Sequence, residues 1–419
     1  MAATARKVEI PVHRCRFCGV TLEKSFVDLG ATPPANSFLR PIDLDRPEPH
    51  YPLHAFVCGA CWLVQLPEIR TPEELFSDYA YFSSFSESWL RHAEAYVDMM
   101  IGRFGFDGDA LAVEIASNDG YLLQFFNQRG VGVLGIEPAA NVAAAAEKKA
   151  IPTEVAFFGR KTAQRLIETG RGADLVVANN VLAHVPDIND FVGGIGTALN
   201  PQGVVTIEFP HLLNLMRETQ FDTIYHEHFS YLSFLTVERI FIAHGMKIFD
   251  VETLPTHGGS LRIFAGHADA ARIEDKRVSQ MRARERLAGL DGPEAYEGFA
   301  ARVNAVKRGL LSFLIAATAD GKTVAGYGAP AKGNTLLNFC GIGSDFIDYT
   351  VDRSPHKQGL FLPGSRIPIY PPERLAQTRP DYVLILPWNL CQEIMTSMAH
   401  IRDWGGRFVT PIPEIRIHP

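Results

Sequence analysis

Four strand-length apolar runs alternate with helical stretches in the middle of the chain, and this alternation limits the possible folds more than any other feature. The runs are LAVEIA at 111–116, VGVLGIE at 131–137, ADLVVAN at 173–179 and GVVTIEF at 203–209. Strands separated by helices are typical of parallel sheets with helices on both faces. We therefore predict an α/β fold with a doubly wound sheet.

Two further apolar runs extend this pattern, MKIFDVETL at 246–254 and SLRIFAGH at 260–267. Their connection, PTHGG, suits a hairpin better than the long crossover that parallel strands need. We expect an antiparallel edge on the sheet.

A second, smaller α/β unit is predicted near the C-terminus. Its strands fall within KTVAGYGAPAKGNTLLNF (322–339), DFIDYTVD (345–352), YVLIL (382–386) and RFVTPI (407–412). The charged stretch 268–296 and a helix near 296–319 connect the two units. We expect three domains, over residues 1–75, 76–267 and 268–419.

The composition excludes several classes of protein. The chain has 419 residues, of which 47% are apolar and 21% charged, as in globular proteins. A net charge of −7 disfavours a nucleic-acid binder. No apolar run reaches membrane-span length, and the N-terminus has no apolar signal core, so we expect a cytoplasmic protein without membrane contact. The oligomeric state is open, with a monomer as the working expectation.

Four of the six cysteines form two C-x-x-C pairs, Cys15 with Cys18 and Cys58 with Cys61. Two such pairs make a tetrahedral thiolate site, and four sulfur ligands leave no position for water or substrate. We predict a structural zinc ion. One alternative is two unrelated pairs of buried thiols. Another is a catalytic redox dithiol, although nothing around the pairs resembles a thioredoxin-type strand.

The first strand ends in a polar turn from Glu114 to Tyr121, at the edge where α/β sheets bind ligands. The turn has one glycine, Gly120, in place of G-x-G-x-x-G, so an adenosyl ligand carrying an amino acid suits it better than a pyrophosphate. Glu137 ends the second strand, where an acid can hold ribose hydroxyls. A structural turn with a capping aspartate is the alternative.

Asn179 and His184 lie at the end of the 173–179 run and just after it, and face the same ligand edge. The alternative for His184 is a partly buried histidine at a helix start.

Tyr225, His226, Glu227 and His228 place four proton-handling side chains in a row. In a strand, Tyr225 and Glu227 share a face opposite the two histidines, whereas in a helix Tyr225 and His228 align. A histidine base suits proton abstraction next to a carbonyl. A metal site is the rival interpretation, although H-E-H lacks the H-E-x-x-H spacing, and a structural polar loop is the third.

Two glycine-containing turns carry groups that bind anions. Lys332 and Asn334 follow Gly326-Tyr327-Gly328 at a helix start, and Lys357 follows the next strand, which favours a diphosphate-linked ligand. Gly258-Gly259 is flanked by His257 and Arg262, which favours an anion or sugar contact. Both turns could instead be ordinary tight turns.

Taken together, these motifs resemble a known family. The two cysteine pairs, YAYFSSFSESW, VEIASNDGYLL, NNVLAHV, YHEHFSYLS, HGGSLRIF and GYGAPAKGNTLLN are similar to those of S-adenosylmethionine-dependent sugar C-methyltransferases, which act on nucleotide-linked 4-keto deoxysugars. The resemblance spans nearly the whole chain in the right order. One departure is Ala116, where methyltransferase loops often carry glycine.

The resemblance implies a zinc-binding N-terminal domain, a class I methyltransferase domain, and a C-terminal Rossmann-like domain that holds the nucleotide sugar. It implies that His228 is the general base of an enolate mechanism. The implied neighbours in the active site are Tyr225, Glu227, His184 and Tyr79. The implied S-adenosylmethionine contacts are Ser117, Asn118, Gly120, Glu137 and Asn179. The expected substrate contacts are Lys332, Asn334, Lys357, Arg262 and His257.

Three other functions stay open at this point: an O- or N-methyltransferase, a nucleotide-sugar sensor without catalysis, and a nicotinamide oxidoreductase. The single-glycine turn counts against the oxidoreductase. The Tyr-His-Glu-His row counts against a sensor, which needs no base.

Overall fold

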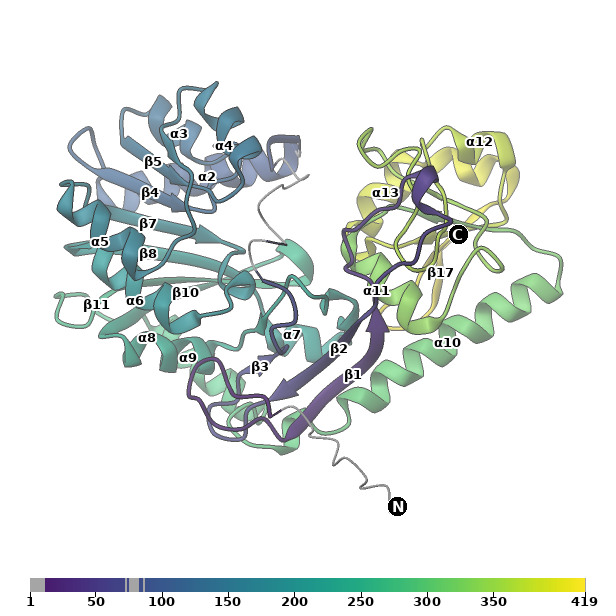
Figure 1. The fold of residues 1–419 in the computed structure, drawn as a ribbon, viewed down its shortest axis with the longest axis horizontal. Coiled ribbons are helices and arrows are strands. Elements are labelled where there is room, and N and C mark those ends of the chain that lie inside the picture. The colour runs from purple at the N-terminus through teal and green to yellow at the C-terminus, as the bar shows by residue number, and fades with distance from the viewer. Residues whose placement is uncertain (1–11, 72–73, 75–82, 86, 419) are drawn as a thin grey trace, which may run out of the picture.

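The computed structural model describes residues 12–71, 74, 83–85 and 87–418. The central part of the chain and the C-terminal part form two lobes, and the long helix α10 runs beneath the C-terminal one (Figure 1). Strands β1 and β2 of the N-terminal part lie at the base, between the two lobes.

The central lobe contains a seven-stranded sheet in the order β10-β11-β8-β7-β4-β5-β6. The strands are β4 (Leu111–Ile115), β5 (Gly132–Ile136), β6 (Thr153–Glu154), β7 (Ala173–Asn179), β8 (Leu199–Pro210), β10 (Met246–Leu254) and β11 (Ser260–His267). Strands β4, β5, β6, β7 and β8 run parallel to one another, whereas β11 runs antiparallel to both β8 and β10. The predicted doubly wound sheet with an antiparallel edge is confirmed. The short strand β6 was not predicted.

The order of this sheet reverses between β4 and β7. At such a switch point the loops after neighbouring strands turn in opposite directions and leave a crevice for a ligand. The polar turn after β4 and the residues after β7 therefore lie at the position where this fold binds its cofactor.

Helices cover the sheet and follow the predicted alternation with strands. They are α2 (Glu87–Phe104), α3 (Leu123–Gln128), α4 (Ala140–Glu147), α5 (Arg160–Glu168), α6 (Ile188–Ala198), α7 (Leu212–Arg217), α8 (Phe234–Ala243) and α9 (Lys276–Leu287). Asp187 and Ser233 begin α6 and α8 by accepting hydrogen bonds from backbone amides in the first turn. Helix α9 lies within the predicted charged connector at 268–296.

The N-terminal sheet has the order β1-β2-β3-β9. Its strands are β1 (Lys24–Thr32), β2 (Tyr51–Val57), β3 (Val64–Gln65) and β9 (Ser230–Tyr231). Strand β9 begins two residues after the Tyr-His-Glu-His row, and it pairs antiparallel with β3, so that Val64 faces Tyr231 and Gln65 faces Ser230. The N-terminal sheet is therefore completed by a segment from the middle of the chain.

The C-terminal lobe contains a second mainly parallel sheet, in the order β14-β13-β12-β15-β16-β17. Its strands are β12 (Val324–Tyr327), β13 (Thr350–Val351), β14 (Ile369–Tyr370), β15 (Tyr382–Ile385), β16 (Arg407–Thr410) and β17 (Arg416–His418). Its helices are α10 (Phe299–Ala319), α11 (Ala331–Cys340), α12 (Arg374–Thr378) and α13 (Cys391–Ser397). The order reverses at β12, so the Gly326–Lys332 loop lies at a second switch point.

Short 3-10 helices connect many of these elements. They are η1 (Pro41–Asp43), η2 (Ser83–Phe85), η3 (Leu182–His184), η4 (Phe221–Thr223), η5 (Thr256–Gly258), η6 (Glu294–Tyr296), η7 (Trp388–Leu390) and η8 (Ala399–Trp404).

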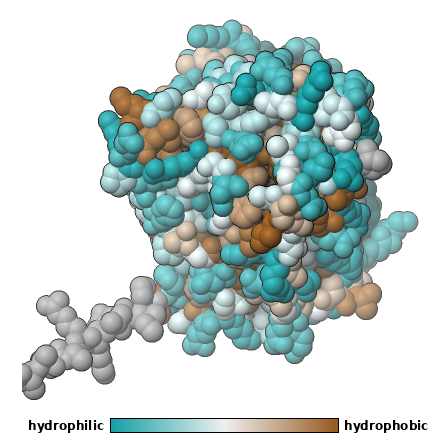
Figure 2. Space-filling model, turned by 90° about the vertical axis from the view of Figure 1, so that its right-hand side faces the viewer, coloured by the Kyte–Doolittle hydropathy of each residue, from teal (hydrophilic) through white to brown (hydrophobic). Residues whose placement is uncertain are grey.

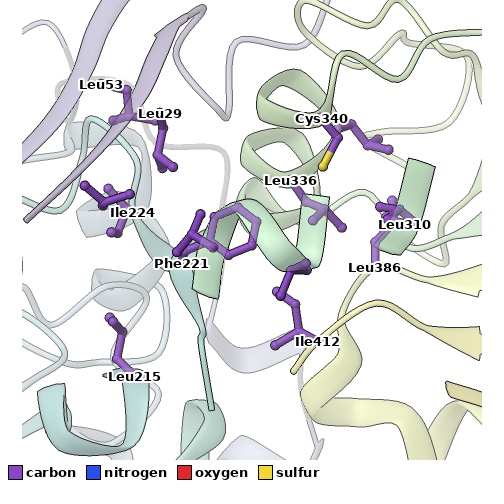
Figure 3. Close-up of a cluster of buried hydrophobic side chains, with 14 of the residues drawn as sticks. Leu29, Leu53, Leu215, Phe221, Ile224, Leu310, Leu336, Cys340, Leu386 and Ile412 are labelled. Atoms are coloured by element: carbon purple, nitrogen blue, oxygen red, sulfur yellow. The ribbon is translucent and has the colours of Figure 1, made fainter. Parts of the chain in front are cut away.

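One hydrophobic cluster joins the N-terminal sheet, the segment around η4 and the C-terminal lobe (Figure 3). Leu29 and Leu53 come from the N-terminal sheet, Phe221 from η4, and Leu336 and Leu386 from the C-terminal lobe. Complete burial of each such side chain contributes about 1.5–3 kcal/mol. We propose that the chain has three domains, because the described residues form three separate sheets. The hydrophobic cluster nevertheless contains residues from more than one of these domains.

The face of the molecule shown in Figure 2 is mainly hydrophilic, with hydrophobic residues in small groups. Among the described residues, no helix combines the length and the apolar character that a membrane span requires.

The shared core predicts that damage to the N-terminal sheet destabilises more than that sheet. Leu53 is fully buried, so Leu53→Ala should lower the free energy of unfolding by about 2–5 kcal/mol, measured by urea unfolding followed by circular dichroism. Leu287→Ala is the control, because Leu287 is 91% exposed and should change it by less than about 0.5 kcal/mol. Equal midpoints for the two variants would contradict the shared core.

Candidate active site and zinc site

The four predicted metal ligands converge. The Sγ atoms of Cys15 and Cys61 lie 3.5 Å apart, those of Cys18 and Cys58 lie 3.4 Å apart, and all four fall within 4.8 Å of one another. A tetrahedral zinc thiolate site needs sulfur separations of about 3.8 Å. The donor set therefore fits a structural zinc ion, as predicted.

Gln65 connects this cluster to the segment that carries the histidines. Its amide nitrogen donates to Cys15 Sγ at 3.2 Å, and its Oε1 accepts from the Arg16 amide at 2.9 Å. In the sheet, Gln65 pairs with Ser230, and the next amide, that of Leu66, donates to Phe229 O at 3.0 Å. The zinc site thus holds the strand that begins two residues after His228.

The Tyr-His-Glu-His row is neither strand nor helix but a tight turn. The amide of His228 donates to Tyr225 O at 2.8 Å, and the two ring centroids lie 4.0 Å apart. Tyr225 and His228 therefore converge, as in the helical alternative. The ring of His184, from η3, meets His228 edge-on with centroids 4.6 Å apart.

The backbone selects the tautomer of His228. Nδ1 lies 2.8 Å from Thr223 O, and because a carbonyl oxygen only accepts, Nδ1 carries the proton. In the neutral ring Nε2 then keeps its lone pair and can accept a proton. Burial, reinforced by His184, holds the pKa of His228 well below its ordinary value, and the Thr223 carbonyl opposes this shift only in part. Burial lowers the pKa of His184 to about 4.

His226 and Glu227 point to the N-terminal sheet. His226 Nε2 lies 3.2 Å from Pro52 O, and Asn36 Nδ2 donates to the two carboxylate oxygens of Glu227 at 2.7 and 3.0 Å. Burial raises the pKa of Glu227 to about 7, and the Asn36 hydrogen bond opposes this shift. The catalytic role of Glu227 stays a prediction, and Asn36, which no sequence motif marks, emerges as its partner.

The turn after β4 is wound tightly. Ala116, Asn118 and Gly120 have φ values of 53°, 51° and 73°, in the left-handed region. A non-glycine residue pays about 1–2 kcal/mol there, and asparagine is the best tolerated. The structure thus explains why methyltransferase loops often carry glycine at the position of Ala116: the backbone needs a positive φ.

Glu137 fastens this turn to the neighbouring strand. Its carboxylate accepts from the amides of Asn118 and Ala139, each at 2.9 Å, and it is buried. A carboxylate has about four acceptor sites, so two remain for ribose hydroxyls. Burial raises the pKa of Glu137, while both amides oppose the shift.

Several buried oxygens near this edge of the sheet have no hydrogen-bond partner among the residues that the structure describes. They are Ser117 Oγ, Asp119 Oδ1, Asn179 Oδ1 and Asn180 Oδ1. Unsatisfied buried acceptors are costly, and the amino group and hydroxyls of S-adenosylmethionine are the donors that would satisfy them. The residues therefore fit the predicted cofactor.

Ser117 has a second role. A Cβ at Gly135 in β5 would lie 2.4 Å from its Oγ, so the strand can pass only because residue 135 is glycine. Sequence reasoning missed Gly135.

Trp89 links the cofactor turn to the Gly258-Gly259 turn. Its ring centroid lies 6.0 Å from that of Tyr121 and 5.6 Å from that of His257. The side chain of Asn180 lies 3.4 Å from His257 Nε2. The predicted sugar contact His257 is therefore next to the cofactor edge.

Arg262 has a different placement. It is 5% exposed, and its donors reach Glu208 at 2.8 Å and Glu252 at 3.1 Å. Its guanidinium therefore joins β8, β10 and β11, and its predicted contact with the sugar stays a prediction.

Two lysines lie near the loop after β12 in the C-terminal lobe, Lys332 at the start of α11 and Lys357 between β13 and β14. Lys332 Nζ lies 2.7 Å from Asn389 Oδ1, and Lys357 Nζ donates to Ala329 O at 2.8 Å. Burial lowers the pKa of each. Asn334 is instead buried, and its amide donates to Ala35 O at 2.6 Å, which ties α11 to the N-terminal part. Tyr79, the remaining predicted active-site residue, lies outside the described residues.

Comparisons with known proteins identify the family. Family models match three successive segments: a zinc binding domain over residues 15–76, a methyltransferase domain over 90–251 and a C-methyltransferase C-terminal domain over 255–413. The chain is 39% identical to the C-methyltransferase NovU of Streptomyces niveus over 407 residues, which are 97% of each protein. The chain belongs to the C-methyltransferase family.

Two further similarities of this C-methyltransferase cover only part of the chain. It is 28% identical over 95 residues to a ubiquinone biosynthesis O-methyltransferase of Rhodopseudomonas palustris, which is 23% of this chain and 38% of that protein. A methyltransferase structure from Clostridium acetobutylicum covers 42% of this chain and 92% of its own, with a TM-score of 0.36 and 9% identity. The family assignment confirms the predicted resemblance, the enzyme class, and S-adenosylmethionine and zinc as its cofactors.

The zinc cluster predicts one zinc ion per chain, measured by metal analysis of the purified protein. Cys61→Ser should reduce the bound zinc severalfold, because a hydroxyl replaces one of the four thiolates. Cys391→Ser is the matched control, since that cysteine lies outside the cluster and should leave the zinc content unchanged. An unchanged zinc content in Cys61→Ser would disprove the site.

The lowered pKa of His228 predicts a ring that stays neutral at physiological pH. Its ring signals in histidine NMR, assigned by their loss in His228→Asn, should begin to titrate only after the pH has fallen below 6.5. In the urea-unfolded protein, histidines should titrate near about 6.5. A folded-state midpoint at or above that of the unfolded chain would mean that burial does not control this ring.

Proposed function

We propose that this C-methyltransferase methylates a carbon atom next to the ketone of a nucleotide-diphosphate-linked 4-keto deoxysugar. The observation that carries the proposal is the His228 imidazole, held by Thr223 in the tautomer whose Nε2 accepts a proton. The motif resemblance to sugar C-methyltransferases and the overall identity to NovU support it. The two lysines beside the loop after β12 support a diphosphate handle.

Methylation at carbon needs a base because a C–H group is not nucleophilic. The neighbouring ketone acidifies that C–H bond, and His228 Nε2 takes the proton while the bonding electrons form an enolate. When bound, S-adenosylmethionine supplies the methyl group to the enolate carbon, and its sulfur keeps the electron pair of the broken bond. The product is a new C–C bond and a protonated imidazole.

The surroundings of His228 suit a base that is neutral before the reaction and protonated after it. A low pKa keeps Nε2 unprotonated before the reaction, and the negative enolate then favours the imidazolium that forms. The rings of Tyr225 and His184 contact the imidazole, so their polar atoms are the nearest candidates to stabilise the enolate oxygen.

The C-terminal lobe would bind the part of the substrate that does not react. Lys332 and Lys357 would hold the diphosphate, and binding energy gained there would align the sugar at the base. We also propose a cytoplasmic location, because none of the six cysteines forms a disulfide and a thiolate zinc site requires reduced cysteines. A monomer remains the working expectation.

The decisive experiment replaces the base. His228→Asn keeps a donor for Thr223 O but has no basic nitrogen, so methyl transfer should fall by about 10²–10⁴-fold. The assay is mass spectrometry after incubation with S-adenosylmethionine and a panel of thymidine-diphospho-4-ketohexoses, and calorimetry should show unchanged binding of S-adenosylmethionine. His400→Asn, at an exposed histidine of the C-terminal lobe, is the control. Near-normal turnover by His228→Asn would rule out this base.

Deuterium oxide separates carbon from oxygen methylation. With S-adenosylhomocysteine in place of the donor, the wild type should place deuterium at the acidic carbon of the sugar, and His228→Asn should not. Methylated product without such exchange, with the methyl group on oxygen, would favour an O-methyltransferase.

A further inference from the structure

A buried contact joins η7 of the C-terminal lobe to the segment that holds His228. Asp222 in η4 is fully buried, and its Oδ2 accepts a hydrogen bond of 2.7 Å from Trp388 Nε1 in η7. The ammonium group of Lys332 lies 4.6 Å from the centroid of the Trp388 ring. Lys332, Trp388 and Asp222 therefore form a continuous chain of contacts across the two lobes.

The chain continues to the base. Asp222 is followed directly by Thr223, whose carbonyl accepts the Nδ1 proton of His228 at 2.8 Å. On the other side of η4, Thr335 in α11 donates to Ile224 O at 3.1 Å. The carbonyl that selects the tautomer is thus supported by two groups of the C-terminal lobe.

The indole has little freedom to move independently. A Cβ at Gly258 would lie 2.8 Å from Trp388 Cη2 and also 2.8 Å from Gln220 Nε2. Gln220, next to η4, donates to Gly258 O at 2.9 Å. A displacement of Trp388 would therefore be transmitted to η4 and to the turn that carries His257.

A buried carboxylate such as Asp222 is not needed merely to hold the two lobes together. Burying a carboxylate is costly, and a neutral side chain of similar shape would accept the same hydrogen bond. Burial raises the pKa of Asp222 to about 6, while the positive charge of Lys332 and the Trp388 hydrogen bond oppose the shift. The carboxylate is therefore sensitive to the charge at Lys332.

We propose that Asp222 and Trp388 are positioning residues that couple anion binding at Lys332 to the orientation of the His228 imidazole. An anion that pairs with Lys332 draws its ammonium group away from the indole, and the change passes through Asp222 to the Thr223 carbonyl. The coupling rests on the proposed function for its purpose, since it would prepare the base only when the diphosphate of the substrate is bound.

Nitrogen-15 NMR of the histidine rings tests the coupling without any sugar substrate. The His228 signals, assigned with His228→Asn, report the tautomer, and inorganic pyrophosphate is the probe. Pyrophosphate should shift these signals in the wild type and leave them unchanged in Trp388→Phe, which keeps an aromatic ring but lacks the indole N–H. Trp404→Phe is the matched control in the same lobe, because the indole N–H of Trp404 donates to Pro380 O rather than to Asp222, and it should respond like the wild type.

The outcomes that would overturn the proposal are specific. One is a pyrophosphate shift that persists in Trp388→Phe. Another is a wild-type protein whose His228 signals do not respond to pyrophosphate, whether or not calorimetry detects binding.

Conservative replacement separates the hydrogen bond from general damage. Asp222→Asn keeps an acceptor oxygen for the indole but removes the negative charge, so it should give a weaker response than the wild type, whereas Asp222→Ala should lose the response. Identical responses from the two variants would argue against the hydrogen bond and overturn the proposal. With a sugar that is methylated, Trp388→Phe should lower kcat about tenfold while KM changes less than about threefold.

The two proposals can fail separately. A panel of 4-ketohexoses that gives no methylated product, together with an intact His228 response, would refute the proposed substrate alone. Methylated product without a response would refute the coupling alone.

Discussion

The two-residue pairing of β3 with β9 is the constraint on which the site depends. Ser230 and Tyr231 follow the histidine turn, and their partners Gln65 and Val64 follow the second cysteine pair. A ladder this short is weak by itself. It persists because Gln65 is also bonded to the zinc cluster through Cys15 and Arg16. The zinc domain therefore acts as a brace for the catalytic turn, although four sulfur ligands exclude it from the chemistry.

Burial shifts the pKa values of two residues in that turn in opposite directions. On one side it keeps His228 neutral, with its basic nitrogen fixed by the Thr223 carbonyl. On the other side it raises the pKa of Glu227, which Asn36 holds against the N-terminal sheet. One desolvated turn thus favours an uncharged base and a carboxyl group with reduced acidity. Both forms would suit the reaction that we propose, in which negative charge develops on a ketone oxygen.

The shared core explains how two binding lobes can serve one reacting centre. Phe221 and Ile224, on either side of Thr223, are buried against residues of the C-terminal lobe and the N-terminal sheet. The carbonyl that orients His228 is therefore set in the packing of all three parts. In the proposed reaction, an orientation defined in this way would cost no rearrangement, which is the physical basis of catalysis by positioning.

Local patterns were sufficient to determine much of this protein. Apolar runs predicted the strands, the paired cysteines predicted the metal ligands, and the Tyr-His-Glu-His row placed Tyr225 and His228 together, because these signals depend on residues close in the sequence. The tertiary structure alone decided that β9 joins the N-terminal sheet, that Asn36 binds Glu227 and that Arg262 is engaged in ion pairs. It also decided the tautomer of His228 and the need for glycine at Gly135. Most of these contacts join residues far apart in the chain, and all of them exist only once the elements pack, so no local pattern encodes them.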